Sequence, residues 1–90
     1  MMKQTEIYQK YFKEGRLVTI PKKEKAKLQL FAYFQEALAE QGQTFTEKEI
    51  NDFFHRYYDD TAILRRYLVD YGFLKRDSYG RTYTIGERNG

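Results

Sequence analysis

Apolar residues recur every three or four positions along most of the chain, a spacing that places them on one face of a helix. The pattern predicts helices over about residues 6–14, 22–41, 46–57 and 61–71. Glycines at positions 15, 42 and 72 follow three of them, where a left-handed residue commonly ends a helix. The residues expected on the inner faces are Ile7, Tyr8, Tyr11 and Phe12, then Leu30, Phe31, Phe34, Ala37 and Leu38, then Ile50, Phe53, Phe54 and Tyr57, and finally Leu64, Tyr67, Leu68 and Tyr71.

Two of these helices have recognisable beginnings. Thr46 stands three residues before Glu49, the spacing of a capping box, in which each side chain accepts a hydrogen bond from the other residue's backbone. Either Asp60 or Thr61 is expected to cap the helix that follows, because both side chains can accept a hydrogen bond from a first-turn N–H group.

The remaining segments favour strands. "RLVTI" is expected to form a short strand that Pro21 ends, since proline cannot donate a ladder hydrogen bond. After Gly72 the period shortens to two, and "FLKRD" and "RTYTI" on either side of "SYG" predict a β-hairpin. This order predicts an α+β fold: a winged helix, which is a helix-turn-helix with a β-hairpin wing, plus an extra N-terminal helix. Residues 1–15 would form that amphipathic helix packed on the domain, 16–86 the winged-helix domain, and 87–90 a frayed tail.

Composition excludes several classes of protein. Hydrophobic residues at 41% and aromatic residues at 18% argue against a disordered chain. Without cysteine there is no thiolate nucleophile, disulfide or thiolate metal site, and the single histidine, His55, excludes a histidine-rich metal site. We therefore expect no catalytic site, no cofactor and no metal. No signal peptide or long apolar run is present, which predicts a cytoplasmic protein with no membrane partner.

Charge is unevenly distributed along the chain. Residues 1–27 carry eight Lys or Arg and three Glu, residues 28–60 carry two basic and seven acidic residues, and residues 61–90 carry six and three. Basic ends around an acidic middle suit a protein that presents one face to a polyanion. A solvated surface of mixed charge is the alternative explanation.

The candidate DNA-binding residues form three groups: Lys22, Lys23, Lys25 and Lys27 at the start of the long helix, Arg65 and Arg66 in the last helix, and Lys75, Arg76 and Arg81 in the hairpin. A helix N-terminus with added lysines is a good phosphate site, and a hairpin can contact the DNA backbone or minor groove. Arg76 could instead form an ion pair with Asp70 or Asp77.

The two arginines differ in their expected direction. At 100° per residue, Arg66 lies almost opposite Leu64 and faces solvent, whereas Arg65 falls on the flank. Arg66 could reach guanine edges or phosphates, or it could merely pair with Asp70 four residues on. The helix begins with Asp59 and Asp60, which would repel phosphates, so we expect any DNA contact to be mainly electrostatic.

The segments "GRLVTIPKKEKAK", "FTEKEIN" and "DDTAILRRYLVDYGFLKRD" resemble the bacterial family catalogued as domain of unknown function 2087. Its members occur alone or appended to helix-turn-helix regulators. The resemblance implies a winged-helix-like fold and a link to transcription, but no established activity.

Two functions therefore remain open. The first is a DNA-binding module of a bacterial transcription regulator that contacts double-stranded DNA. The second is a protein-interaction, effector or dimerisation module that keeps the winged-helix shape without binding DNA, with a homodimer or a regulator as its partner. One continuous basic face would favour the first, and basic groups on opposite sides would favour the second.

Overall fold

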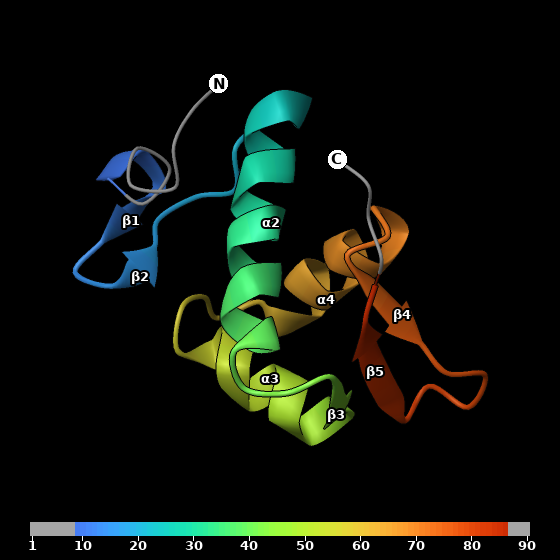
Figure 1. Cartoon of the computed structure of the whole chain (residues 1–90). Coiled ribbons are helices and arrows are strands. Elements are labelled where there is room, and N and C mark those ends of the chain that lie inside the picture. The colour runs from blue at the N-terminus through green and yellow to red at the C-terminus, as the bar shows by residue number, and fades with distance from the viewer. Residues whose placement is uncertain (1–8, 87–90) are drawn as a thin grey trace.

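The computed structural model describes residues 9–86, which form a mixed α+β fold around one long helix (Figure 1). The elements follow one another as β1 (Phe12–Lys13), β2 (Arg16–Leu17), α2 (Glu24–Ala39), β3 (Thr44–Thr46), α3 (Glu47–His55), α4 (Thr61–Asp70), β4 (Leu74–Arg76) and β5 (Thr82–Ile85). β1 and β2 form one small antiparallel sheet. The second sheet has the order β3-β5-β4 and is also antiparallel, so its middle strand is the last in the sequence.

The helices that carry the hydrophobic core agree with the apolar spacing. α2 buries Ala26, Leu30, Phe31, Phe34 and Leu38. Ala37, which was also expected inside, is half-buried. α2 begins two residues later than predicted because Lys23 has an extended backbone (φ −72°, ψ 134°) and takes the capping position.

Both predicted helix caps are present. The Thr46 hydroxyl accepts a hydrogen bond from the Glu49 N–H at 3.1 Å, and the Glu49 carboxylate accepts one from the Thr46 N–H at 2.8 Å. The carboxylate of Asp60, rather than the hydroxyl of Thr61, accepts from the Ile63 N–H at 3.1 Å. Each such cap contributes about 1 kcal/mol to the stability of its helix.

The core is one cluster of aliphatic and aromatic side chains between the helices and the larger sheet. Leu64 and Leu68 of α4, Ile50, Phe53 and Phe54 of α3, and Phe34 of α2 all belong to it, as the spacing predicts. Phe34 is fully buried, and its ring centroid lies 5.4 Å from that of Phe54 in an edge-to-face contact. Aromatic pairs of this kind contribute about 0.5–1.5 kcal/mol beyond the burial of their area.

The strand β3 was missed by the sequence analysis, which placed Thr46 at the start of a helix and no strand before it. Thr44, Phe45 and Thr46 pair with Thr84, Tyr83 and Thr82 of β5. Three residues are too few to display an alternating pattern, and the partner strand lies far away in the sequence. Phe45 is the buried residue of β3.

The N-terminal region also differs from the prediction. Residues 9–11 are helical, but Phe12 and Lys13, expected in the same helix, form β1 and pair with Leu17 and Arg16. Between the two strands Glu14 (φ 53°) and Gly15 (φ 81°) both have positive φ, the geometry that closes a two-residue hairpin. Only Arg16 and Leu17 of the predicted strand are therefore extended in a sheet. The rest of the predicted first helix and the tail at 87–90 lie outside the described residues.

Long-range hydrogen bonds join the helices to other parts of the fold. Arg16 donates to the carbonyl oxygens of His55 (3.1 Å) and Arg56 (3.4 Å), the last residues of α3 and its cap. The amide of Gln35 in α2 donates to the carbonyl oxygens of Phe73 (2.9 Å) and Gly86 (2.8 Å). The small N-terminal sheet is thereby joined to the turn between α3 and α4, and α2 to the larger sheet.

Candidate nucleic-acid interface

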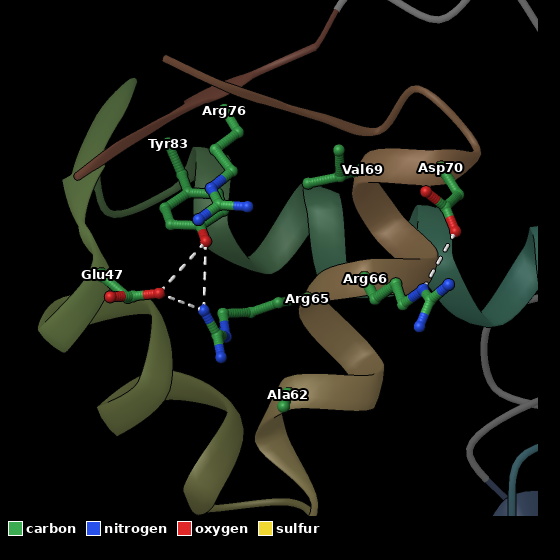
Figure 2. Close-up of a pocket in the computed structure, with 8 residues that line it drawn as sticks. All are labelled: Glu47, Ala62, Arg65, Arg66, Val69, Asp70, Arg76 and Tyr83. Atoms are coloured by element: carbon green, nitrogen blue, oxygen red, sulfur yellow. Dashed lines mark hydrogen bonds and ion pairs between the residues drawn. The ribbon is translucent and has the colours of Figure 1, made fainter. Parts of the chain in front are cut away.

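A groove of about 430 Å³ lies between α4 and the hairpin formed by β4 and β5 (Figure 2). It is lined by Glu47, Ala62, Arg65, Arg66, Val69, Asp70, Arg76 and Tyr83. Five of these come from α4, which contributes one wall of the groove. The groove brings together three of the nine predicted DNA-binding residues, from two different elements.

Arg65 is turned into the protein rather than toward solvent. Its guanidinium forms an ion pair with Glu47 at the start of α3 and donates to the Tyr83 hydroxyl at 3.1 Å. Figure 2 shows both contacts converging on one nitrogen of the guanidinium. The side chain of Arg65 is only 20% exposed. Arg65 therefore holds α4 against α3 and β5, and the flanking position predicted for it places it beside these partners.

Arg66 faces solvent, as the helical geometry predicts. Its side chain is 83% exposed, and its Nε lies 3.8 Å from the Asp70 carboxylate four residues on. An exposed pair at this spacing contributes only about 0.3–0.5 kcal/mol. The guanidinium can therefore leave Asp70 at little cost when a phosphate approaches.

A second groove, of about 320 Å³, runs along the other flank of Arg66. Its lining residues are Ile63, Arg66, Tyr67 and Asp70. Lys27 of α2 lies beside it, with its Nζ 5.1 Å from the centre of the Tyr67 ring. Arg66 thus borders both grooves, with Lys27 next to one and Arg76 in the wall of the other. We call these three residues, Lys27, Arg66 and Arg76, the basic band.

The β4–β5 hairpin presents further exposed cations, Lys75, Arg76 and Arg81. Neither acidic partner considered for Arg76 is bound to it: Asp70 lies near Arg66, and the Asp77 carboxylate accepts from the Arg81 N–H at 2.8 Å. That backbone hydrogen bond is the main reason why the pKa of Asp77 lies below its ordinary value. Within residues 9–86, Arg76 forms no ion pair, so its charge is available to a ligand.

The lysine cluster at the start of α2 is only partly joined to this surface. Lys22, Lys23 and Lys25 are exposed, whereas Lys27 is half-buried against Tyr67. In Figure 1 the start of α2 lies at the top of the molecule and the β4–β5 loop at the lower right. Lys27 is therefore the lysine that connects the cluster with α4, a contact that the sequence pattern did not indicate.

The two acidic residues at the start of α4, Asp59 and Asp60, form contacts with other groups of the protein. Asp60 caps α4, and Asp59 forms an ion pair with Arg16 at 2.8 Å. The side chains of Arg16 and Asp59 are 48% and 92% exposed, so the pair offsets the negative charge but leaves it at the surface. The sequence analysis did not assign a role to Arg16.

Residues 9–86 hold neither a membrane-spanning helix nor a cluster of metal ligands. In the part of the chain that the structure describes, no helix is long and apolar enough to cross a membrane. Among the same residues, no three His, Cys, Asp or Glu side chains gather where they could hold a metal ion. His55 is exposed at the end of α3.

Comparison with known proteins places the chain in a family. No curated protein and no solved structure matches it. A family profile does match, over residues 16–85, which include every element from β2 to β5 and all nine of the predicted DNA-binding residues. The chain therefore belongs to the family described as an uncharacterised protein conserved in bacteria, domain of unknown function 2087.

Proposed function

We propose that this protein is a winged-helix module that binds double-stranded DNA, as part of a bacterial transcription regulator. The element order supports this fold, because α3 and α4 follow each other as in a helix-turn-helix and lead into the β4–β5 hairpin. The pairing of β3 with β5 adds a third strand, which attaches the hairpin, or wing, to the start of α3. In such a module the second helix and the wing face the DNA.

The observation that carries the proposal is the basic band across α4. Arg66 is 83% exposed and borders a groove on each side. Arg76 lies across one groove, and Lys27 lies next to the other. Three cations from α2, α4 and β4 thus lie in or beside the two grooves that flank α4, and Lys75 and Arg81 add exposed charge to the same hairpin as Arg76.

The same geometry favours contacts to phosphates over the reading of bases. Arg65 is bound to Glu47, so it cannot reach a base edge without breaking an ion pair. The leading end of α4 offers Asp59 and Asp60, and carboxylates there repel the DNA backbone. Contacts from Arg66 and the wing to phosphates fix orientation but carry little sequence information. The module would therefore bind many sequences with similar affinity.

Fluorescence anisotropy with several unrelated duplexes over a range of salt concentrations tests this function. We expect similar affinities for all duplexes and a steep fall with salt, because bound phosphates release counterions. Arg76→Glu and Arg66→Glu should weaken binding to every duplex and reduce the salt slope by about one unit per lost phosphate contact. Lys13→Glu, the same charge change in β1 on the far side of α2 from the wing in Figure 1, is the matched control.

Two outcomes would contradict this account in different ways. A strong preference for one duplex that Arg66→Ala alone abolishes would mean that α4 reads bases. The absence of binding to any duplex at low salt would remove DNA from the function. The protein-interaction module would then be the better proposal.

A further inference from the structure

Tyr79 lies in the loop of the β4–β5 hairpin and is 84% exposed. Most large apolar side chains of residues 9–86 are buried or packed against the core, and only Val18, at 62%, is comparably exposed. An aromatic ring held in water contributes nothing to the stability of the fold. Such a ring indicates a binding partner only where the loop holds it in one position.

The loop that carries Tyr79 is held by its own hydrogen bonds. The Asp77 N–H donates to the Thr82 carbonyl oxygen at 2.9 Å, and the Gly80 N–H donates to the Asp77 carbonyl oxygen at 3.1 Å. The Asp77 carboxylate accepts from the Arg81 N–H at 2.8 Å. Tyr79 is thus presented from a closed turn, which reduces the entropy lost when the ring is covered.

The glycine at position 80 leaves room for the guanidinium of Arg76 against the turn. Gly80 has a φ of 72°, and any Cβ at this position would overlap the Arg76 guanidinium. Arg76 therefore lies against the turn at Gly80, the residue that follows Tyr79 in the chain. Tyr79 and a free cation are consequently presented together at one end of the hairpin.

The charges around the ring identify the chemistry of a partner. Lys75, Arg76 and Arg81 are exposed, whereas the carboxylate of Asp77 in the same loop is bound to the loop backbone. An exposed aromatic ring on a hairpin that also carries exposed cations matches a strand that alternates flat bases with phosphates. An uncharged apolar protein surface would use the ring but not the cations of the hairpin.

We propose that Tyr79 stacks on an unpaired nucleobase, so that the module binds locally opened or single-stranded DNA more tightly than continuous duplex. This inference rests on the proposed function, because it assigns a base contact to the same wing. In continuous duplex the base faces are covered by their neighbours, and only phosphates are offered to the hairpin. Where a base is unpaired, its face is open to the ring while the flanking phosphates reach Arg76 and Arg81.

The test compares three DNAs of equal length: a duplex, the same duplex with a short central bubble of mismatches, and one of its strands. Anisotropy at a fixed low salt concentration gives the three dissociation constants. The parent protein should bind the bubble and the single strand at least about fivefold more tightly than the duplex, the lower end of the effect of one stacked base. Tyr79→Phe should keep this preference, because it retains the ring.

Two further variants separate stacking from apolar contact. Tyr79→Leu keeps apolar surface without a flat ring, and Tyr79→Ala removes both; each should abolish the preference and leave duplex affinity unchanged. Val18→Ala changes the other exposed apolar residue and should leave every dissociation constant unchanged. Because Tyr79 is exposed, thermal melts of its variants should match the parent.

The outcomes distinguish the inference from the proposed function. Duplex binding without any preference for unpaired bases, or a preference that survives Tyr79→Ala, would overturn the stacking role alone. A preference retained by Tyr79→Leu would also overturn it, since the contact would then be apolar rather than aromatic. Failure of the protein to bind any of the three DNAs would overturn both proposals.

Discussion

The guanidinium of Arg65 is bound to the carboxylate of Glu47, and this ion pair joins the middle of α4 to the first turn of α3. The Tyr83 hydroxyl lies 3.1 Å from the same guanidinium and extends the contact to β5. Arg66, the next residue, is 83% exposed and has only a long contact to Asp70. Two adjacent arginines thus have different roles: Arg65 holds α4 in place, and Arg66 is available to a ligand.

This difference predicts unequal effects on stability. Arg65→Ala leaves Glu47 and the Tyr83 hydroxyl with only the long hydrogen bond of 3.5 Å between them, which should lower the free energy of unfolding by about 1–3 kcal/mol. Arg66→Ala, the matched change on the exposed side, should alter it by less than about 0.5 kcal/mol. Urea denaturation of both variants measures the difference. Equal effects would mean that Arg65 does not hold α4 to α3.

A second prediction concerns the contact of Arg16 with the end of α3. Arg16→Ala removes the hydrogen bonds to the His55 and Arg56 carbonyl oxygens and the ion pair with Asp59. The carbonyl contacts stabilise the negative end of the helix. The free energy of unfolding of this variant, measured by thermal denaturation, should therefore be lower by about 1 kcal/mol. Asp59→Asn removes only the exposed ion pair and should lower the free energy of unfolding by less, about 0.5 kcal/mol or below. A larger loss for Asp59→Asn would show that the ion pair, rather than the helix end, is the important contact.

The close approach of two chain segments at Gly86 gives a third prediction. A Cβ at Gly86 would overlap the carbonyl oxygen of Gly72, and the Gly86 N–H donates to the Phe73 carbonyl oxygen at 2.8 Å. Gly86→Ala should therefore push β5 away from the end of α4 and cost about 1–3 kcal/mol. Gly42→Ala is the control, because its Cβ would meet only the Phe45 ring, at an ordinary 3.8 Å. Differential scanning calorimetry of the two variants should show a lower melting temperature for Gly86→Ala alone.

A fourth prediction concerns pH and the hairpin loop. The N–H of Arg81 donates to the Asp77 carboxylate and lowers its pKa, a direction that burial partly opposes. A group with a lowered pKa in the folded state stabilises that state above its unfolded pKa and stops doing so as pH falls through the folded pKa. The loop should therefore be unchanged between pH 7 and 5 and loosen only below about pH 4, near the ordinary value for Asp.

The amide proton shift of Arg81, followed by NMR during an acid titration, reports this event directly. Its midpoint should lie below the ordinary Asp pKa, and Asp77→Ala should abolish the titration. A midpoint at or above the ordinary value would contradict the hydrogen bond.

Sequence patterns predicted the parts of this fold that depend on local spacing. The faces of α2, α3 and α4 follow from apolar periodicity, and the caps at Thr46 and Asp60 follow from residue type and position. The helical rotation of 100° per residue explains why Arg66 faces outward and why Asp70, four residues on, lies next to it.

Contacts between distant residues explain what the patterns missed. β3 exists because three residues pair with β5 across the molecule, and no local signal marks them. Glu47 is the partner of Arg65 eighteen residues away, and Lys27 meets Tyr67 only because α2 and α4 pack together. The sequence could predict that basic residues form the candidate interface. It could not predict which of them are bound within the protein and which are available to a ligand.

The central claim is that DNA lies across the basic band and the wing, and an NMR titration with an unrelated duplex tests it most directly. Amide shifts in ¹H–¹⁵N spectra should change for Lys27, Arg66, Arg76 and the loop around Tyr79, and should stay unchanged in β1 and β2. The changes should diminish together as salt is added, because the contacts are electrostatic. Shifts confined to β1, β2 and the far side of α2, or no shifts at low salt, would contradict the account.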